Sequence, residues 1–365
     1  MNPERAAKHQ QVANYLEEHR LGAVLLSRRC NFSWYTCGAR NYVGNACEIG
    51  NSWLLVSKGG ACVLTNNIEG PRLKDEELGE IELASFAWPD AAERDKVFRK
   101  MIGPMRIAVD APVTGVEAAV LGRDFDMLRW RLSDSEILRY RELCDDTVAA
   151  MEGVARAAKA GMSEYELAAA LSAALLARSC QPWVTLVAGD DRVEKYRHPL
   201  PTEKKVRKYF MLVTCAERGG LLSACTRLAS FGPLSRDLSL KHQAVANVDA
   251  ALISSTRPGV SLGELFELAK AAYAETGYPD QWRLHHQGGS CGYQPREVKA
   301  GPGEQAAVLA DQAFAWNPSI TGTKSEDTIF CRADGCEVLG GKSDWPMIEG
   351  RWKGASIPRP DILVL

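Results

Sequence analysis

The sequence lacks the features that mark several large functional classes. Its formal net charge is -2 and no long run of lysine and arginine occurs, so no nucleic-acid surface is expected. The most basic stretch, residues 204–208 (KKVRK), is interpreted as a solvated turn before a strand. There is no apolar run of about eighteen residues, and the polar N-terminal segment does not resemble a secretory signal. We therefore expect a soluble, cytoplasmic protein that binds neither nucleic acid nor membranes.

Disulfide and metal motifs are also missing. The 11 cysteines include no CxxC pair and no disulfide-scaffold spacing, so we interpret them as reduced thiols. His198, His285, His286 and Glu326 have side chains that could bind one zinc ion, but no HExxH or similar spacing connects them. The residues alone therefore predict neither a metal nor another cofactor.

The length predicts two domains. A chain of 365 residues with 46% hydrophobic residues exceeds what one small domain needs. Ser133 followed by Glu136 forms a capping-box pattern that opens a helix to about residue 160. We place the domain boundary there, giving domains 1–132 and 133–365. In the first, helices and strands indicate a small α/β domain, with helices at 6–20, 91–102 and 115–121, and strands at 21–26, 52–56, 61–64 and 106–110.

The second half contains an internal repeat of element types. Two helices precede a group of strands, and the same order then occurs again. The expected helices are 163–179, 238–255 and 262–276, and the expected strands are 183–187, 209–215, 221–228, 313–316 and 327–331. The fold class predicted for the whole chain is α+β.

Three stretches concentrate polar side chains near strand ends. They are KYRHPLPTEKK (195–205), HHQGGSCGYQPRE (285–297) and WNPSITGTKSEDT (316–328). A histidine such as His198 suits proton transfer at neutral pH, and Arg296 suits a substrate carboxylate. A proline-rich surface turn, a pair of packed histidines and a solvated turn remain the structural alternatives for the three stretches.

The order of several motifs resembles a known family. The landmarks are SEILRYR (135–141), His198-Pro199, ERGGLLSACTR (217–227), His286 and EDT (326–328). Together they resemble the pita-bread fold of creatinase, prolidase, aminopeptidase P and methionine aminopeptidase. The first half resembles the N-terminal domain of creatinase and aminopeptidase P. The resemblance implies a pseudo-two-fold repeat and a homodimer in which the N-terminal domain closes the neighbouring subunit's site, with Arg40, Asn41 and Tyr42 as the candidates to reach it.

The resemblance also bears on metal binding. The peptidase members hold two divalent metals with two aspartates eleven residues apart, one histidine and two glutamates. These positions fall on Val213, Ala224, His286 (or His285), Asn317 and Glu326 of this chain. Valine and alanine cannot bind a metal and an amide is a weak ligand, so the resemblance implies a metal-free member.

Creatinase works without a metal, and its pattern supplies expected roles. A histidine at the position of His198 carries the proton from the attacking water to the leaving nitrogen. Arg296-Glu297 resembles the Arg-Glu pair that follows the glycine motif in creatinase. Thr226 and Asn317 replace two creatinase glutamates, which disfavours a guanidinium substrate such as creatine.

The leading hypothesis is a metal-independent hydrolase of a carbon–nitrogen bond in a small carboxylate-bearing substrate. The catalytic residues would be His198, His286 and Glu326. Residues expected to contact the substrate are Arg296, Asn317, Thr226, His285, Glu297, Asp327 and Arg40.

Three alternatives remain for the function. One is an inactive pita-bread scaffold. Another is an Xaa-Pro metallo-aminopeptidase in which Asp190, Asp191 or Glu297 replaces the lost ligands. The third is a lyase or isomerase at the same site. The enzyme hypotheses require His198, His286, Arg296, Asn317, Glu326 and Asp327 to face one cavity, and the sequence does not decide whether His285 or His286 points inward.

Overall fold

The computed structural model describes residues 2–341 and 343–365. The chain forms two compact units that divide between Arg129 and Trp130, whereas the sequence placed the boundary between 132 and 133. No helix in the described ranges has both the length and the apolar character needed to cross a membrane.

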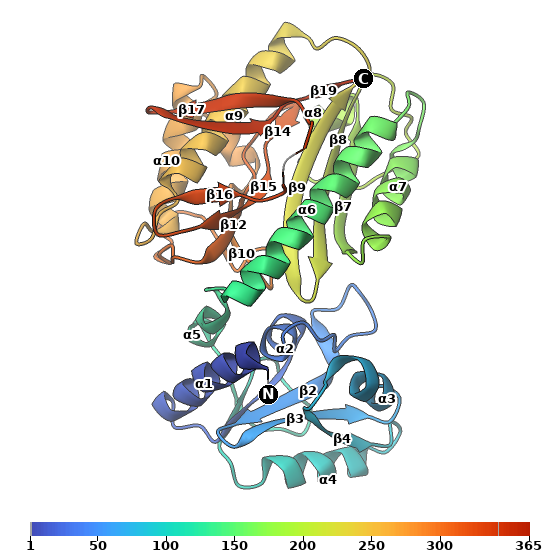
Figure 1. The fold of residues 1–365 in the computed structure, drawn as a ribbon, viewed down its shortest axis with the longest axis vertical. Coiled ribbons are helices and arrows are strands. Elements are labelled where there is room, and N and C mark those ends of the chain that lie inside the picture. The colour runs from blue at the N-terminus through green and yellow to red at the C-terminus, as the bar shows by residue number, and fades with distance from the viewer. Residues whose placement is uncertain (1, 342) are drawn as a thin grey trace. The chain divides into compact units, whose positions relative to one another are not determined.

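The first unit is a mixed six-stranded sheet with helices (Figure 1). The strand order is β4-β3-β2-β1-β5-β6. The strands are β1 (Ala23–Arg28), β2 (Ile49–Ser57), β3 (Gly60–Asn66), β4 (Glu82–Phe86), β5 (Ile107–Val109) and β6 (Ala119–Val120). The helices are α1 (Pro3–Glu18), α2 (Arg29–Thr36), α3 (Gly70–Arg72), α4 (Ala91–Ile102) and α5 (Arg123–Asp126).

The helix predicted at 115–121 is wrong. Gly115 has a φ of 80°, and β6 follows it as a short strand that pairs in parallel with β5. A helix of seven residues is marginal on its own, and strand pairing gives the same backbone groups partners.

The second unit contains a long sheet whose main path runs β11-β10-β12-β15-β9-β8-β7 (Figure 1). The path strands are β7 (Gln181–Gly189), β8 (Tyr209–Arg218), β9 (Leu221–Ser230), β10 (Gly288–Cys291), β11 (Val298–Lys299), β12 (Gln312–Trp316) and β15 (Asp327–Cys331). β16 (Cys336–Val338) pairs with β15, and β19 (Leu363–Val364) pairs with β9. Two small ladders join β13 (Ser319–Ile320) to β14 (Thr323–Lys324), and β17 (Met347–Trp352) to β18 (Ala355–Pro360).

Three helices of the second unit begin within about one residue of their predicted starts, at 134, 164 and 262, one begins at 236 instead of 238, and the short helix at 191–195 was not predicted. The five helices are α6 (Asp134–Ala157), α7 (Glu164–Leu176), α8 (Asp191–Lys195), α9 (Arg236–Ser255) and α10 (Leu262–Glu275). Ser133 and Glu136 form the predicted capping box at the start of α6, and Ser163 and Ser261 cap α7 and α10 in the same way. Each serine oxygen accepts a backbone N–H that a helix start leaves without a partner.

The repeated order of elements brings the two halves of the second unit together at one strand pair. β7, β8 and β9 follow α6 and α7, and β10, β12 and β15 follow α9 and α10. The two groups join where β9 lies antiparallel to β15, with Cys225 opposite Asp327. This junction places Thr226 beside Glu326, although a hundred residues separate them in the chain.

Candidate functional site

A cavity of about 430 Å³ lies in the second unit, wholly within residues 184–326. Val184, Leu186 and Val213 form an apolar wall. The remaining lining residues are His198, Cys215, His286, Pro295, Arg296, Lys299, Asn317, Lys324 and Glu326. An apolar wall with a few polar groups on one side is typical of a small-molecule site.

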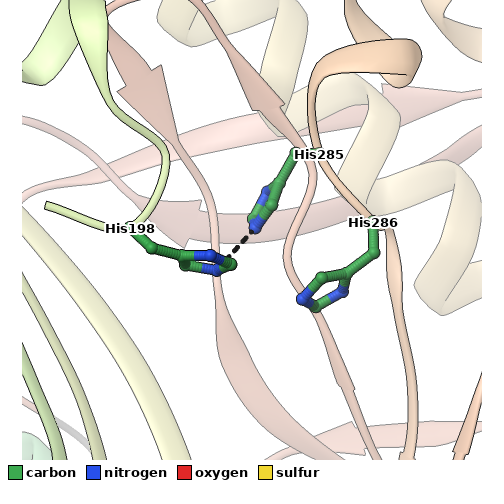
Figure 2. Close-up of side chains that lie close together, drawn as sticks. All are labelled: His198, His285 and His286. Atoms are coloured by element: carbon green, nitrogen blue, oxygen red, sulfur yellow. Dashed lines mark hydrogen bonds between the residues drawn. The ribbon is translucent and has the colours of Figure 1, made fainter.

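Three histidines meet at this cavity. The Nε2 atoms of His198 and His285 lie 3.1 Å apart, within hydrogen-bond distance (Figure 2). The ring of His286 is centred 5.8 Å from that of His198 and 4.7 Å from that of His285. His286 lines the cavity, whereas His285 is buried and reaches it through His198.

Local contacts hold the two neighbouring histidines in different orientations. Nδ1 of His285 contacts Oγ of Ser319 at 3.2 Å, and its backbone carbonyl accepts a hydrogen bond from Gln287 at 2.6 Å. The backbone N–H of Gly288 donates to Nδ1 of His286 at 3.2 Å. A neutral His286 therefore carries its proton on Nε2, which makes that atom a donor.

The histidines are held neutral by their surroundings. Burial is the main cause of the lowered pKa of His198, and the positive charge of Lys324 lowers it further. Burial together with Arg296 and Lys299 lowers the pKa of His286 to about 3, and burial and Lys324 strongly lower that of His285. A neutral imidazole is able to accept a proton from water, which is the state that a general base requires.

Glu326 is the cavity's one carboxylate among its lining residues, and both of its oxygens are engaged. Oε2 accepts hydrogen bonds from Lys324 Nζ at 2.5 Å and Thr226 Oγ1 at 2.7 Å. Oε1 accepts one from Arg296 at 3.2 Å. Burial alone raises the pKa of Glu326, but the charges of Lys324 and Arg296 outweigh that effect and lower it. Glu326 is therefore ionised at neutral pH.

The cavity carries an excess of positive charge. Arg296, Lys299 and Lys324 face one carboxylate, Glu326, so the lining has a net charge of two positive units when its histidines are neutral. Lys299 is exposed and makes no ion pair with any residue in the described ranges. Such a lining attracts anions.

Two buried polar atoms at the cavity have no partner within the described structure. They are Oδ1 of Asn317, a residue that is 2% exposed, and Nε of Arg296. A buried polar group without a hydrogen bond is unfavourable by about 1–3 kcal/mol. A ligand that donates to Asn317 and accepts from Arg296 would satisfy both.

Asp327 does not line the cavity, whereas His198, His286, Arg296, Asn317 and Glu326 do. The expected convergence of all six residues is therefore wrong for Asp327, which has no role in the chemistry of the cavity. Asp327 follows Glu326 directly in an extended segment, so its side chain points to the opposite face. There it accepts hydrogen bonds from Arg227 and Arg359, each at 2.8 Å. Arg359 also pairs with Asp249 at 2.7 Å, so Asp327 belongs to a buried ion network.

Two other predicted contacts also differ from expectation. Thr226 donates to Glu326 rather than lining the cavity, and Glu297 lies beside Gly292 outside the lining. Arg40, in the first unit, pairs with Glu77 of the same unit. Its contribution to the site of a neighbouring subunit stays a prediction.

Sequence reasoning missed Lys299 and Lys324. Lys324 is 2 residues before Glu326, and residues at this spacing share a face in an extended segment. That spacing within residues 316–328 was the available signal. Lys299 carried no comparable signal, because pairing of β11 with β10 brings it to the cavity.

Cys215 also lines the cavity, but it is a poor nucleophile there. Burial raises the pKa of its thiol to about 11, so the reactive thiolate is scarce at neutral pH.

The three histidines form the one group of potential metal ligands that the described residues contain, with ligand atoms within 4.8 Å of one another. Two features oppose a cation at this place. The lining is already positive, and the contact between Gly288 and His286 uses one ring nitrogen and leaves the proton on the other. The arrangement suits hydrogen bonding and proton transfer better than metal binding.

A family model described as metallopeptidase family M24 matches residues 139–336. An uncharacterized peptidase of Staphylococcus aureus is 26% identical over 122 residues, which cover 32% of this chain and 35% of that protein. A second S. aureus peptidase matches to the same extent at 25% identity. The match thus spans about a third of the length of these curated relatives.

Solved structures with the same fold cover nearly the whole chain. An X-Pro aminopeptidase from Thermotoga maritima has a TM-score of 0.79 at 16% identity, covering 98% of this chain and 99% of its own. A prolidase from Pyrococcus horikoshii has a TM-score of 0.78 at 18% identity, covering 92% and 99%. The N-terminal domain of a FACT complex subunit from chickpea has a TM-score of 0.70 at 12% identity, covering 92% and 95%. At these identities the likeness concerns the fold, which is the pita-bread fold expected from the motifs.

The metal ions that the family description implies do not fit this cavity. Val213 lines it with an apolar side chain, and Ala224 has no ligand atom in its side chain. The carboxylate of Glu326 is already bound by Lys324 and Arg296. Asp190 and Asp191, considered as replacement ligands, lie elsewhere: Asp190 accepts the backbone N–H groups of residues 207–209, and Asp191 pairs with Lys195 and Lys204.

Proposed function

This chain belongs to metallopeptidase family M24, and we propose that it hydrolyses a carbon–nitrogen bond of a small carboxylate-bearing substrate without a metal ion. One observation carries the proposal: a neutral histidine, His198, shares a cavity with the cations Arg296 and Lys324. A base beside anion-binding groups is what hydrolysis of such a substrate requires.

His198 would move the proton. Its Nε2 contacts His285, while its Nδ1 has no partner within the described residues and is available to water. As water attacks the substrate carbon, His198 takes one of its protons. It then returns that proton to the leaving nitrogen, so that the carbon–nitrogen bond breaks and the histidine is neutral again.

His285 is a positioning residue in this proposal. Ser319 holds one of its ring nitrogens, and the other contacts His198. This chain of contacts would fix the ring of His198 in the orientation that presents Nδ1 to water.

The other cavity residues would stabilise charge. Arg296 and Lys324 would bind carboxylate charge of the substrate, and the Nε2–H of His286 is a donor suited to the negative charge that develops on the attacked group. Oδ1 of Asn317 would accept a hydrogen bond from an N–H of the substrate. Glu326 would hold Arg296 and Lys324 in place, and Thr226 would support Glu326.

A scaffold without activity is the second candidate. The observation in its favour is the replacement of metal ligands by Val213 and Ala224. The buried atoms of Asn317 and Arg296 that lack hydrogen-bond partners favour a ligand site, because leaving them without partners is unfavourable unless a ligand binds there.

A metallo-aminopeptidase would require new carboxylate ligands at the cavity. A lyase or isomerase would use the same base, and product analysis separates it from a hydrolase.

The test is a substrate screen followed by one substitution. N-acyl amino acids, N-carbamoyl amino acids, guanidino acids and dipeptides are incubated with chelator-treated protein, and release of an amine is measured. For a substrate found in this way, His198→Ala should lower kcat by about 10²–10⁴-fold and leave the Kd nearly unchanged.

His19→Ala, in the first unit, is the control and should leave both values unchanged. Retention of most turnover by His198→Ala would refute the mechanism. Activity that appears only when divalent metal is added would refute metal independence.

A further inference from the structure

We infer that the cavity selects small dicarboxylates, with the two carboxylates bound at separate positive poles. This inference rests on the proposed function for the choice of site, and it goes further by naming the charge of the ligand. It arises from Lys299 and Lys324 together with Arg296.

The first pole is deep. Lys324 is buried with 4% of its side chain exposed, and its ammonium group donates to Oε2 of Glu326. An ammonium group has three protons, so Lys324 retains donors beyond this contact.

The second pole lies nearer the surface. Arg296 and Lys299 line the same cavity, and Arg296 contacts the other carboxylate oxygen of Glu326, Oε1, at 3.2 Å. Lys299 is exposed and has no ion-pair partner within the described residues. The buried Nε atom of Arg296 has no hydrogen-bond partner within them. This pole can accept a whole anionic group.

Glu326 cannot neutralise both poles. It lies between them, with Oε2 on Lys324 and Oε1 on Arg296, and it contributes a single negative charge. Two positive charges remain. A monocarboxylate would leave one of them without a counter-charge, whereas a dicarboxylate matches the lining.

The size of the cavity agrees with a small molecule. About 430 Å³ lies within the range of ligand pockets, and the apolar wall of Val184, Leu186 and Val213 suits a short carbon chain between two carboxylates. A compact dianion such as phosphate concentrates both charges on one centre, whereas a dicarboxylate distributes them along its chain.

The experiment measures binding by calorimetry and requires no turnover. The probes are succinate and glutarate, their monoamides succinamate and glutaramate, and inorganic phosphate. Wild-type protein should bind at least one dicarboxylate about tenfold or more tighter than its monoamide, a difference of about 1.4 kcal/mol. Phosphate should bind no better than the monoamides.

The matched variants are Lys299→Gln and Lys159→Gln. Both lysines are exposed, and Lys159 lies outside the cavity. Lys299→Gln should weaken dicarboxylate binding about tenfold and monoamide binding less than threefold, while Lys159→Gln should change neither.

Equal affinity for a dicarboxylate and its monoamide would overturn the inference, as would failure of every dicarboxylate to bind at a Kd below about 10 mM. Tighter binding of phosphate would favour a compact dianion and would also overturn it. Selective dicarboxylate binding without hydrolysis of any amide would refute the proposed function and leave the dicarboxylate inference standing. Rapid hydrolysis of monoanionic substrates would refute the dicarboxylate inference and leave the proposed function standing.

Discussion

The ion pair between Lys324 and Glu326 allows the sharpest test of the site's construction. The two groups lie 2.5 Å apart and are 4% and 3% exposed. Lys324→Met removes the ammonium group and keeps a side chain of similar length, so the carboxylate loses one of its two cations while its burial persists. Breaking a buried ion pair in this way lowers the free energy of unfolding by about 3–5 kcal/mol.

Arg296 reduces the loss of stability caused by Lys324→Met. Its guanidinium remains 3.2 Å from Oε1 of Glu326 and still compensates part of the carboxylate's charge. We therefore expect the free energy of unfolding to fall by about 3 kcal/mol, at the lower end of that range. Glu326→Gln and Arg296→Met introduced together with Lys324→Met remove all three charges, and the triple variant should lose only about 1 kcal/mol, because no buried charge is left without a counter-charge.

The assay is urea unfolding at neutral pH, monitored by circular dichroism and tryptophan fluorescence to check that the transitions coincide. Lys299→Met is the matched control, since it removes a cation of the same cavity that is exposed and makes no ion pair with a described residue. It should change the free energy of unfolding by less than about 0.5 kcal/mol. Equal losses in Lys324→Met and the triple variant would show that the ammonium group does not compensate Glu326.

Acid should destabilise the protein through its neutral histidines. The pKa of His286 falls from 6.5 to about 3 on folding, so between these values the unfolded chain binds a proton that the folded chain does not. The free energy of unfolding should therefore fall as the pH drops from about 6.5 to about 5, by about 1–2 kcal/mol for this partly exposed ring, and His286→Asn should reduce the loss measured in urea. For His285, the expected effect concerns turnover: His285→Ala should lower kcat about tenfold or more with little change in KM, and His285→Gln, whose amide can still reach His198, should restore part of it. A rise in KM with unchanged kcat would place His285 among the substrate-binding residues instead.

Much of the fold could be predicted because local chemistry determines it. The capping box of Ser133 and Glu136 was visible as a spacing of three residues, and α4 begins and ends at the predicted residues 91 and 102. Residues 115–121 show the limit of this reasoning. Their apolar pattern is short, and pairing with β5, where Ala108 lies opposite Ala119, decided their structure instead of local helix propensity.

The candidate site was predicted in part. His198, His286, Arg296, Asn317 and Glu326 lie at one cavity as expected. The expectation failed for Asp327, because the alternation of an extended segment turns adjacent side chains to opposite faces. Attention to that alternation would have separated Asp327 from Glu326 and paired Glu326 with Lys324.

The sequence by itself determined the family pattern, the two-part organisation and the types of group available for chemistry, since these depend on motif order and composition. It also showed that Val213 and Ala224 cannot bind metal, because ligand capacity belongs to the side chain alone. Tertiary structure alone decided that His285 lies behind His198 while His286 faces the cavity. It also decided that Lys299 lines the cavity together with Arg296. Charge balance and ring orientation depend on distances between segments far apart in the chain, and pairing of β9 with β15 and of β10 with β11 sets those distances.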